Sequence, residues 1–385
     1  MLLRTEPPLS LRFVNGLSAL LRETPREHVH VHKDSNLELV PQPHSQADMF
    51  VQLPFEIIDH IVGYLDIKDV RPIARVCSTF RLPAQLQLFR TIRLVSSPYK
   101  PYPDRVESIL STPHLLQYLS HLEVLCYSTH ETSFHSLLPR LSIMYRLSSM
   151  KIYLYLDDCS RALSALESLG SEKQIALNLG RTLDPNLLIS DNPLPVYSLH
   201  LHVGAPNHRV VIRLVRKCAQ SLRQLTLILK DSTIPPLPSL PHLCECSLQY
   251  SSRNDLDLMS WFPFLNQHPT ITRISLGGFT LAVQPSPNLL PNLQLLEATP
   301  QIIERLIPGR PVNHIRALYH SQAADRFPDD IMLQPLRQPF VSVTTLAIFT
   351  NIHFPNGLLI SIDQAVPKLR KFILRWTCYE VRQLS

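Results

Sequence analysis

The stretch Leu222-Arg223-Gln224-Leu225-Thr226-Leu227 contains the spacing that decides the fold of this chain. Its apolar residues occupy the first, fourth and sixth positions. The last two therefore lie on the same side of an extended strand, because successive side chains of a strand alternate between its two faces. We predict that Leu225 and Leu227 are buried and that Thr226 is exposed on the opposite face.

The same spacing recurs through most of the chain after residue 95. The first residues of the copies are Leu122, Leu147, Val196, Leu222, Leu243, Ile271, Leu293, Val343 and Leu369. Ile175/Leu177/Leu179 and Ile315/Leu318/His320 are degraded copies. The first positions mostly lie 21 to 28 residues apart, which is the period of leucine-rich repeats. One strand with one helix cannot bury its own apolar face, so such repeats stack into a curved solenoid.

The segments between several copies read as helices. Val211, Leu214, Val215 and Cys218 share one helical face, for example. Proline stands two residues before the first apolar position in four copies, where we expect it to end a helix and start a strand. These residues are Pro241, Pro269, Pro291 and Pro367. The predicted fold class is α/β, a curved parallel sheet with outer helices that follows a small three-helix domain.

Residues 50–94 supply those three helices. Pro54 suits the first turn of a helix, and Ile57, Ile58, Ile61 and Leu65 are expected on one face of it. Asp66 to Asp69 predict a turn and an N-cap, which would leave Pro72 within the first turn of the second helix. The apolar positions of that helix are Val70, Ile73, Val76, Cys77 and Phe80. Pro83 is expected to begin the third helix.

Several strings in this region carry a family resemblance: Leu53-Pro54-Phe55-Glu56-Ile57-Ile58, Tyr64-Leu65, Asp69-Val70, Val76-Cys77 and Leu88-Phe89-Arg90. The region resembles an F-box, particularly those of filamentous and mushroom-forming fungi. The resemblance implies that these helices bind the Skp adaptor subunit, which attaches the protein to a cullin scaffold with a RING subunit. The expected adaptor-binding residues are Leu53, Pro54, Ile57, Ile58, Ile61, Leu65, Val70, Ile73, Val76, Cys77 and Phe80.

Composition excludes several other classes of function. The net charge is +6 over 385 residues without a run of five like charges, so we expect no nucleic-acid partner. The chain has 34 Pro and 9 Gly and lacks the glycine-rich motifs that bind nucleotides, and we expect no cofactor. The chain contains no stretch of 18 uninterrupted apolar residues, so we expect no membrane span. Seven scattered cysteines favour a reducing compartment, cytoplasmic or nuclear.

Two residue groups invite a chemical interpretation. Cys244 and Cys246 beside His242 suggest thiol or metal chemistry, but the repeat spacing places Cys246 in the core and Cys244 on the other side. His28, His30 and His32 share one side of a possible strand within the tail of residues 1–49. No Cys or acidic partner follows at zinc spacing, so we favour a solvated extended segment over a metal site. We expect a protein that is not itself an enzyme.

These observations predict a substrate-receptor subunit of an SCF-type (Skp-cullin-F-box) ubiquitin ligase. Residues 50–94 would bind the adaptor, and residues 95–385 would recruit an unknown target protein. The alternative is an interaction scaffold that delivers no target for ubiquitination. Alternation along the strands predicts which residues face a target on the concave surface. They are Lys151, Tyr153, Arg273, Tyr319, Phe349, Lys371, Arg375 and, beside the last strand, Trp376. Their charge favours an acidic or phosphorylated segment.

Overall fold

The computed structural model describes residues 53–76, 78–95, 112, 116–126, 137–154, 159–167, 169, 173–184, 192–231, 236–251, 256–318, 343–350 and 358–376. The tail of residues 1–49 with its three histidines, Cys77 and Tyr319 lie outside these ranges. The chain divides into two compact units, residues 1–125 with 132–148 and residues 126–131 with 149–385. The domain boundaries at residues 49 and 94 stay predictions.

Three helices and two strands make up most of the first unit. They are α3 (Phe55–Gly63), α4 (Ile67–Val76), α5 (Ser78–Phe89), β1 (Thr91–Val95) and β2 (His121–Cys126), followed by the 3-10 helix η3 (Leu138–Ile143). The three helices pack around a core of Ile58, Val62, Val70, Phe80 and Ala84, all buried. The strands β1 and β2 run parallel and pair Ile92 with Leu122.

The helix boundaries differ from those predicted. The Asp66 carbonyl accepts the N–H groups of Asp69 and Val70 (2.8 and 3.1 Å), so α4 begins at Ile67. Pro72 therefore lies inside α4, where it removes one backbone hydrogen bond. Phe80 belongs to α5, and Pro83 is inside that helix instead of at its start. A new helix beginning at Ser78 explains both differences.

A parallel sheet with helices on one side forms the second unit. Its strands are β3 (Ser149–Leu154), β4 (Gln174–Thr182), β5 (Val196–Val203), β6 (Gln224–Leu229), β7 (Glu245–Tyr250), β9 (Arg273–Gly277), β11 (Leu295–Ala298), β12 (His314–Leu318), β13 (Thr345–Thr350) and β14 (Lys371–Trp376). They follow one another in sequence order. A separate parallel pair joins β8 (Leu256–Asp257) to β10 (Phe279–Thr280).

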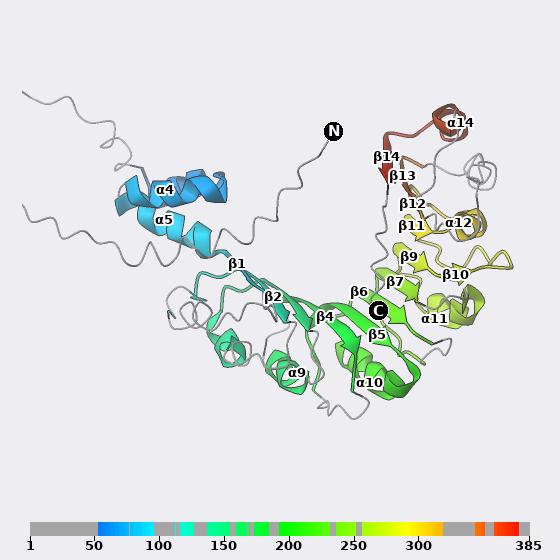
Figure 1. Ribbon diagram of the computed structural model, residues 1–385, viewed down its shortest axis with the longest axis horizontal. Coiled ribbons are helices and arrows are strands. Elements are labelled where there is room, and N and C mark those ends of the chain that lie inside the picture. Colours follow the sequence, from blue (N-terminus) through cyan, green and yellow to red (C-terminus); the bar gives the residue numbers. More distant parts are fainter. Residues whose placement is uncertain are drawn as a thin grey trace, which may run out of the picture. The chain divides into compact units, whose positions relative to one another are not determined.

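The helices of this unit are α9 (Ser160–Glu167), α10 (His208–Cys218), α11 (Phe262–Asn266), α12 (Pro300–Leu306) and α14 (Leu358–Ala365), with the 3-10 turns η4 (Ala205–Asn207) and η5 (Leu258–Trp261). They lie on the outer side of the sheet, and its inner face carries no described helix (Figure 1). The predicted fold class is confirmed.

Buried ladders across the strands explain why these repeats stack. Leu225 pairs in register with Leu199 on one side and with Cys246 on the other, and Cys246 pairs with Ile274. Each of the four is at most 3% exposed. Thr226, between Leu225 and Leu227, is half-buried on the inner face. The alternation predicted from Leu222 to Leu227 is therefore correct, although Thr226 is less exposed than expected.

Two copies were predicted in the wrong register. Ile315 pairs with Leu296 and Leu346, the middle apolar residues of their copies, so the true copy is Val312/Ile315/Ala317. The apolar spacing of this copy was hard to recognise because its last residue, Ala317, is small. Leu119 is fully buried. Its N–H donates to the Leu116 carbonyl, and the N–H of Leu147, the first residue of the next copy, donates to the Met144 carbonyl in the same way. The first predicted copy therefore begins at Leu119 instead of Leu122.

All four prolines lie in turns, and two of them, Pro269 and Pro367, also follow the end of a helix, α11 and α14, within three residues. Each is the second residue of a turn in which the first apolar residue of the copy donates its N–H to the carbonyl three residues before. These hydrogen bonds are Leu243 to Leu240, Ile271 to His268, Leu293 to Leu290 and Leu369 to Val366 (3.0–3.2 Å). Proline suits the second turn position because its fixed φ matches the turn geometry.

Substitution at neighbouring strand positions tests this register. Leu225→Ala should lower the free energy of unfolding by roughly 2 to 5 kcal/mol, because it leaves a cavity between two strands. Thr226→Ala should change it by less than about 0.5 kcal/mol. Urea unfolding of both variants measures the difference. Equal losses would show that the two side chains are not on opposite faces of the sheet.

A buried arginine holds the turns beside α12. Arg310 is 4% exposed. Its guanidinium donates to the carbonyls of Leu289 (2.7 Å), Leu306 (2.5 Å), Pro308 (3.0 Å) and Ser286 (2.7 Å). Burial lowers the pKa of Arg310 to about 10, so the group remains charged at neutral pH. One cation thus joins the end of α12 to the turn that precedes the copy of Leu293.

His268 is a buried histidine of the second unit whose protonation should affect stability. Its Nε2 accepts the Leu240 N–H (2.8 Å), so the proton is on Nδ1, which donates to the Phe264 carbonyl (2.6 Å). Burial lowers the pKa of His268, although the bond to Phe264 acts the other way.

Below about pH 6.5 an unfolded histidine takes up a proton that folded His268 resists, so stability should fall as the pH falls. Protonation of His268 Nε2 also removes the acceptor for the Leu240 N–H, so this hydrogen bond is lost. His268→Gln should be less stable at neutral pH but lose less stability on acidification. Urea unfolding at several pH values measures this slope. A slope equal to that of the wild type would assign the pH dependence to other groups.

Candidate functional site

An exposed apolar stripe runs along α3. Ile57, Ile61 and Tyr64 are spaced by four and three residues, so they lie on one side of the helix. They are 48%, 39% and 78% exposed. Phe55 at the start of α3 and Ile67 at the start of α4 are also exposed apolar residues. We call Ile57, Ile61 and Tyr64 the α3 stripe.

The structure divides the residues predicted to bind an adaptor into two groups. Ile58, Val70 and Phe80 are buried in the core of the helices, which leaves them no surface for a partner and corrects the prediction that Ile57 and Ile58 act together. Pro54, Ile57 and Ile61 are exposed, whereas Leu53, Leu65 and Ile73 are half-buried. Cys77 and the side chain of Val76 lie outside the described part. Adaptor contact itself stays a prediction.

Tyr64, the most exposed member of the stripe, belongs to the strings that resemble an F-box, but it was not predicted to bind the adaptor. It lies seven residues after Ile57, and that spacing alone would have placed it on the same side of the helix. The prediction assigned Ile57, Ile58, Ile61 and Leu65 to one face and left Tyr64 out of it. Val62, which was also missed, completes the buried face with Ile58.

Polar residues of the second unit form a cross-strand row on the inner face of the sheet. In register from β3 to β12 the row contains Tyr153, Asn178, His200, Thr226, Ser247, Ser275, Glu297 and Arg316. The three short side chains in its middle leave a hollow of about 170 Å³, bordered by Glu245, Arg273, Glu297 and Arg316. We call this the inner hollow.

Ion pairs neutralise the charges around the inner hollow. Arg273 Nη1 lies 2.7 Å from Glu245 Oε1, and Arg316 Nη1 lies 3.1 Å from Glu297 Oε2. The Ser275 hydroxyl donates to the second oxygen of Glu297 (3.1 Å). The prediction of an acidic target weighed four cations, Arg273 among them, against Glu245 and Glu297. The pairing of Arg273 with Glu245 across neighbouring strands takes Arg273 out of that support.

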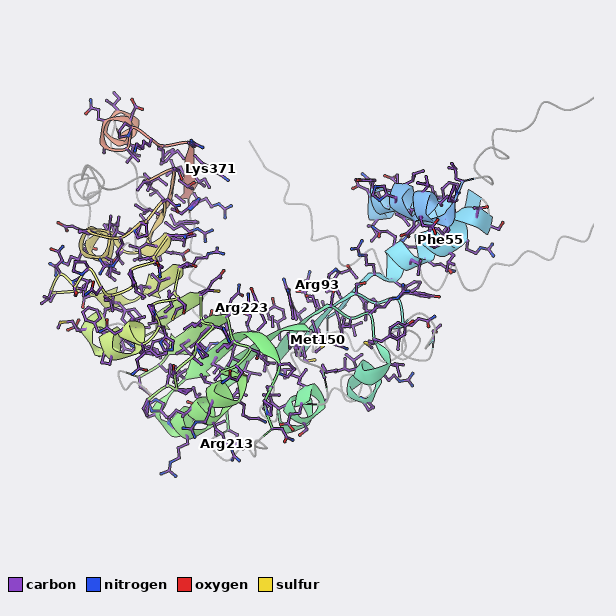
Figure 2. All side chains as sticks on the ribbon, turned by 180° about the vertical axis from the view of Figure 1, so that it is seen from behind. Phe55, Arg93, Met150, Arg213, Arg223 and Lys371 are labelled. Atoms are coloured by element: carbon purple, nitrogen blue, oxygen red, sulfur yellow. The ribbon has the colours of Figure 1, made fainter. Side chains whose placement is uncertain are left out.

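The remaining residues predicted to bind a target are spread along the sheet. Lys151 and Tyr153 lie on β3, and Lys151 is exposed. At the other end, the Arg375 guanidinium stands 5.9 Å from the centre of the Phe349 ring, and Lys371 is exposed on β14 (Figure 2). The side chain of Trp376 lies outside the described part. The structure thus brings Phe349 and Arg375 together but does not gather all the predicted residues.

Two histidines and two cysteines near this face are shifted toward their neutral forms. Burial lowers the pKa of His200 and of His202, whose rings are 5.8 Å apart; His202 also lies near Lys230. Burial raises the pKa of the Cys246 thiol to about 12 and raises that of Cys244 as well. Neither thiol is therefore an activated nucleophile at neutral pH.

Among the described residues, no group of three or more His, Cys, Asp or Glu side chains is placed to hold a metal ion. Within the same residues, no helix combines the length and apolar character needed to cross a membrane.

Comparison with known proteins gives a family match for one region and a similar solved structure. Residues 50–95 match the family model of F-box-like domains. That region contains the α3 stripe. Among solved structures, the leucine-rich repeat-containing protein LegL7 from Legionella pneumophila is similar at 15% sequence identity and a TM-score of 0.43, covering 74% of this chain and 90% of that one. No curated protein matches the chain.

Proposed function

We propose that this chain is a substrate-receptor subunit of an SCF-type ubiquitin ligase. The observation that carries the proposal is the exposed α3 stripe within a region that matches F-box-like domains. In this proposal the stripe, with Pro54 and the half-buried Leu53, Leu65 and Ile73, binds a Skp adaptor. The adaptor connects the chain to a cullin–RING assembly, and the inner face of the repeats recruits the target.

The mechanism would be proximity. The chain would hold a target lysine near ubiquitin carried by another subunit, which raises the effective concentration of the reacting groups. This role needs no cofactor and no catalytic residue in this chain. No disulfide bond joins the described cysteines, and we propose a reducing compartment, cytoplasmic or nuclear.

Hydrogen–deuterium exchange with purified Skp adaptor tests the adaptor contact. Amides of α3 and the turn after it, residues 54–67, should exchange more slowly in the complex. Amides of β5 to β9 should be unchanged. Protection confined to the sheet, or no protection at any concentration that keeps both proteins soluble, would reject the F-box role.

The target surface has a separate test. We expect Arg375→Ala combined with Trp376→Ala to weaken binding of a captured target at least tenfold, which is ~1.4 kcal/mol. Pull-down with increasing chain concentration measures this. The adaptor should bind the same variant normally. If the target is retained at full strength, target recognition does not use this end of the sheet.

A further inference from the structure

The last strand of the sheet has an open edge. β14 is the final strand in the order of the sheet, and among the described residues no strand pairs with its other side (Figure 1). Alternate residues of a strand direct their N–H and C=O groups to opposite edges. Alternate backbone groups of β14 therefore point away from β13, its one described neighbour. An extended segment added beside β14 would satisfy these groups.

The apolar residues of the last described copy are incompletely covered. Leu369 and Phe372 are half-buried, and Leu374 is 45% exposed. The three corresponding residues of the preceding copy, which begins at Val343, are fully buried. A repeat buries its apolar residues against the next one, so this end of the sheet presents an apolar surface beside β14.

The inner face of the same strand carries two cations. Lys371, Ile373 and Arg375 are alternate residues of β14, so they point to the inner face. Lys371 and Arg375 are exposed, and neither forms an ion pair with a described residue. The position of Arg375 over the Phe349 ring orients its guanidinium and leaves the N–H groups available for a carboxylate.

A second copy of this chain does not suit this edge. In a symmetric antiparallel pair of β14 strands centred on Ile373, Lys371 of one copy would face Arg375 of the other. Like charges directly opposite each other on neighbouring strands are destabilising. The two cations therefore favour a partner that has acidic residues at the facing positions.

We infer that an extended segment of a partner protein pairs with β14 as an additional strand, with acidic residues on the inner face and apolar residues on the other. Lys371 and Arg375 are about 13 Å apart along the strand, so two carboxylates four residues apart in the segment would face them. The apolar residues next to each carboxylate would cover Phe372 and Leu374. Target recruitment through this edge rests on the proposed function, whereas the pairing itself can be measured without any other ligase subunit.

Fluorescence anisotropy of the full chain with the labelled peptide Gly-Glu-Val-Thr-Leu-Glu-Gly tests the inference. The peptide should bind, and its affinity should fall as salt is added. Two further forms of the peptide carry N-methyl groups, one on the amides of Val and Leu, the other on those of Thr and the second Glu. Because only alternate residues of an added strand bond to β14, one form should bind at least about tenfold more weakly than the other.

Two double variants of the chain define the surface. Lys371→Gln combined with Arg375→Gln should weaken binding of the unmodified peptide at least about tenfold. Lys151→Gln combined with Arg223→Gln is the matched control, because it removes the same charge from exposed positions of the same unit. Lys151 occupies the position of β3 that corresponds in register to Lys371. The control should bind the peptide like the wild type.

The inference is wrong if the wild type does not bind the peptide, if the two methylated forms bind equally, or if the two double variants lose the same affinity. Binding only to a chain shortened after Trp376 would also reject it, because residues 377–385 would then occupy the edge. So would a dimer, detected by sedimentation, that excludes the peptide, since the edge would then pair with a second copy. None of these results bears on adaptor binding by the α3 stripe, so the two proposals fail separately.

Discussion

Arg310→Ala is expected to lower the free energy of unfolding of the second unit by about 3 to 5 kcal/mol. The reason is that four carbonyl oxygens, those of Ser286, Leu289, Leu306 and Pro308, lose the cation that satisfies them. Buried acceptors left without donors cost the full desolvation of each group. Urea unfolding followed by circular dichroism measures the loss.

Two control variants define the cause. Arg310→Lys keeps the charge but cannot reach four carbonyls with the geometry of a planar guanidinium, so its loss should be intermediate. Arg370→Ala removes an exposed arginine and should cost less than about 0.5 kcal/mol. Similar stability of the Arg310→Ala and Arg370→Ala variants would contradict the clamp described for Arg310.

Ile61→Asp is expected to weaken adaptor binding at least 30-fold, ~2 kcal/mol, without unfolding the helices. Ile61 is 39% exposed, so a carboxylate there remains solvated in the free protein. In a complex that covers the α3 stripe, the same carboxylate would be buried without a partner. Isothermal titration calorimetry with the Skp adaptor measures the change.

Gly63→Asp is the matched control on the same helix. Gly63 lies about half a turn away from Ile61 around the helix axis. A Cβ at this position would meet no heavy atom within 4 Å. The variant introduces the same charge and should bind the adaptor like the wild type. If it loses as much affinity as Ile61→Asp, the effect is one of net charge and not of the α3 stripe.

The repeats could be predicted from sequence because their signal is local and periodic. The alternation inferred from the spacing correctly identifies Leu225, Cys246 and Ile274 as buried. The signal failed where the apolar residue is small, as at Ala317. It also failed where two helices join, because Phe80 continues the apolar spacing of α4 although it belongs to α5.

The interaction surfaces were less accessible to sequence reasoning. Periodicity identifies an apolar helix such as α3, but only packing against α5 decides that Ile58 is inside and Ile57 outside. Likewise, the pairing of Arg273 with Glu245 joins residues 28 positions apart, and no local pattern predicts it. The role of Arg310 depends on four backbone carbonyls, which carry no sequence signal.

Reconstituted ubiquitin transfer tests the central proposal most directly. The purified chain would be combined with the Skp adaptor, a cullin–RING assembly, a ubiquitin-charged enzyme and a partner captured by the chain from its native cells. The account predicts that ubiquitin is attached to the partner with the wild type and with Gly63→Asp, but not with Ile61→Asp. Assembly of the complete complex without modification of any captured partner would contradict it and would indicate a scaffold that delivers no target.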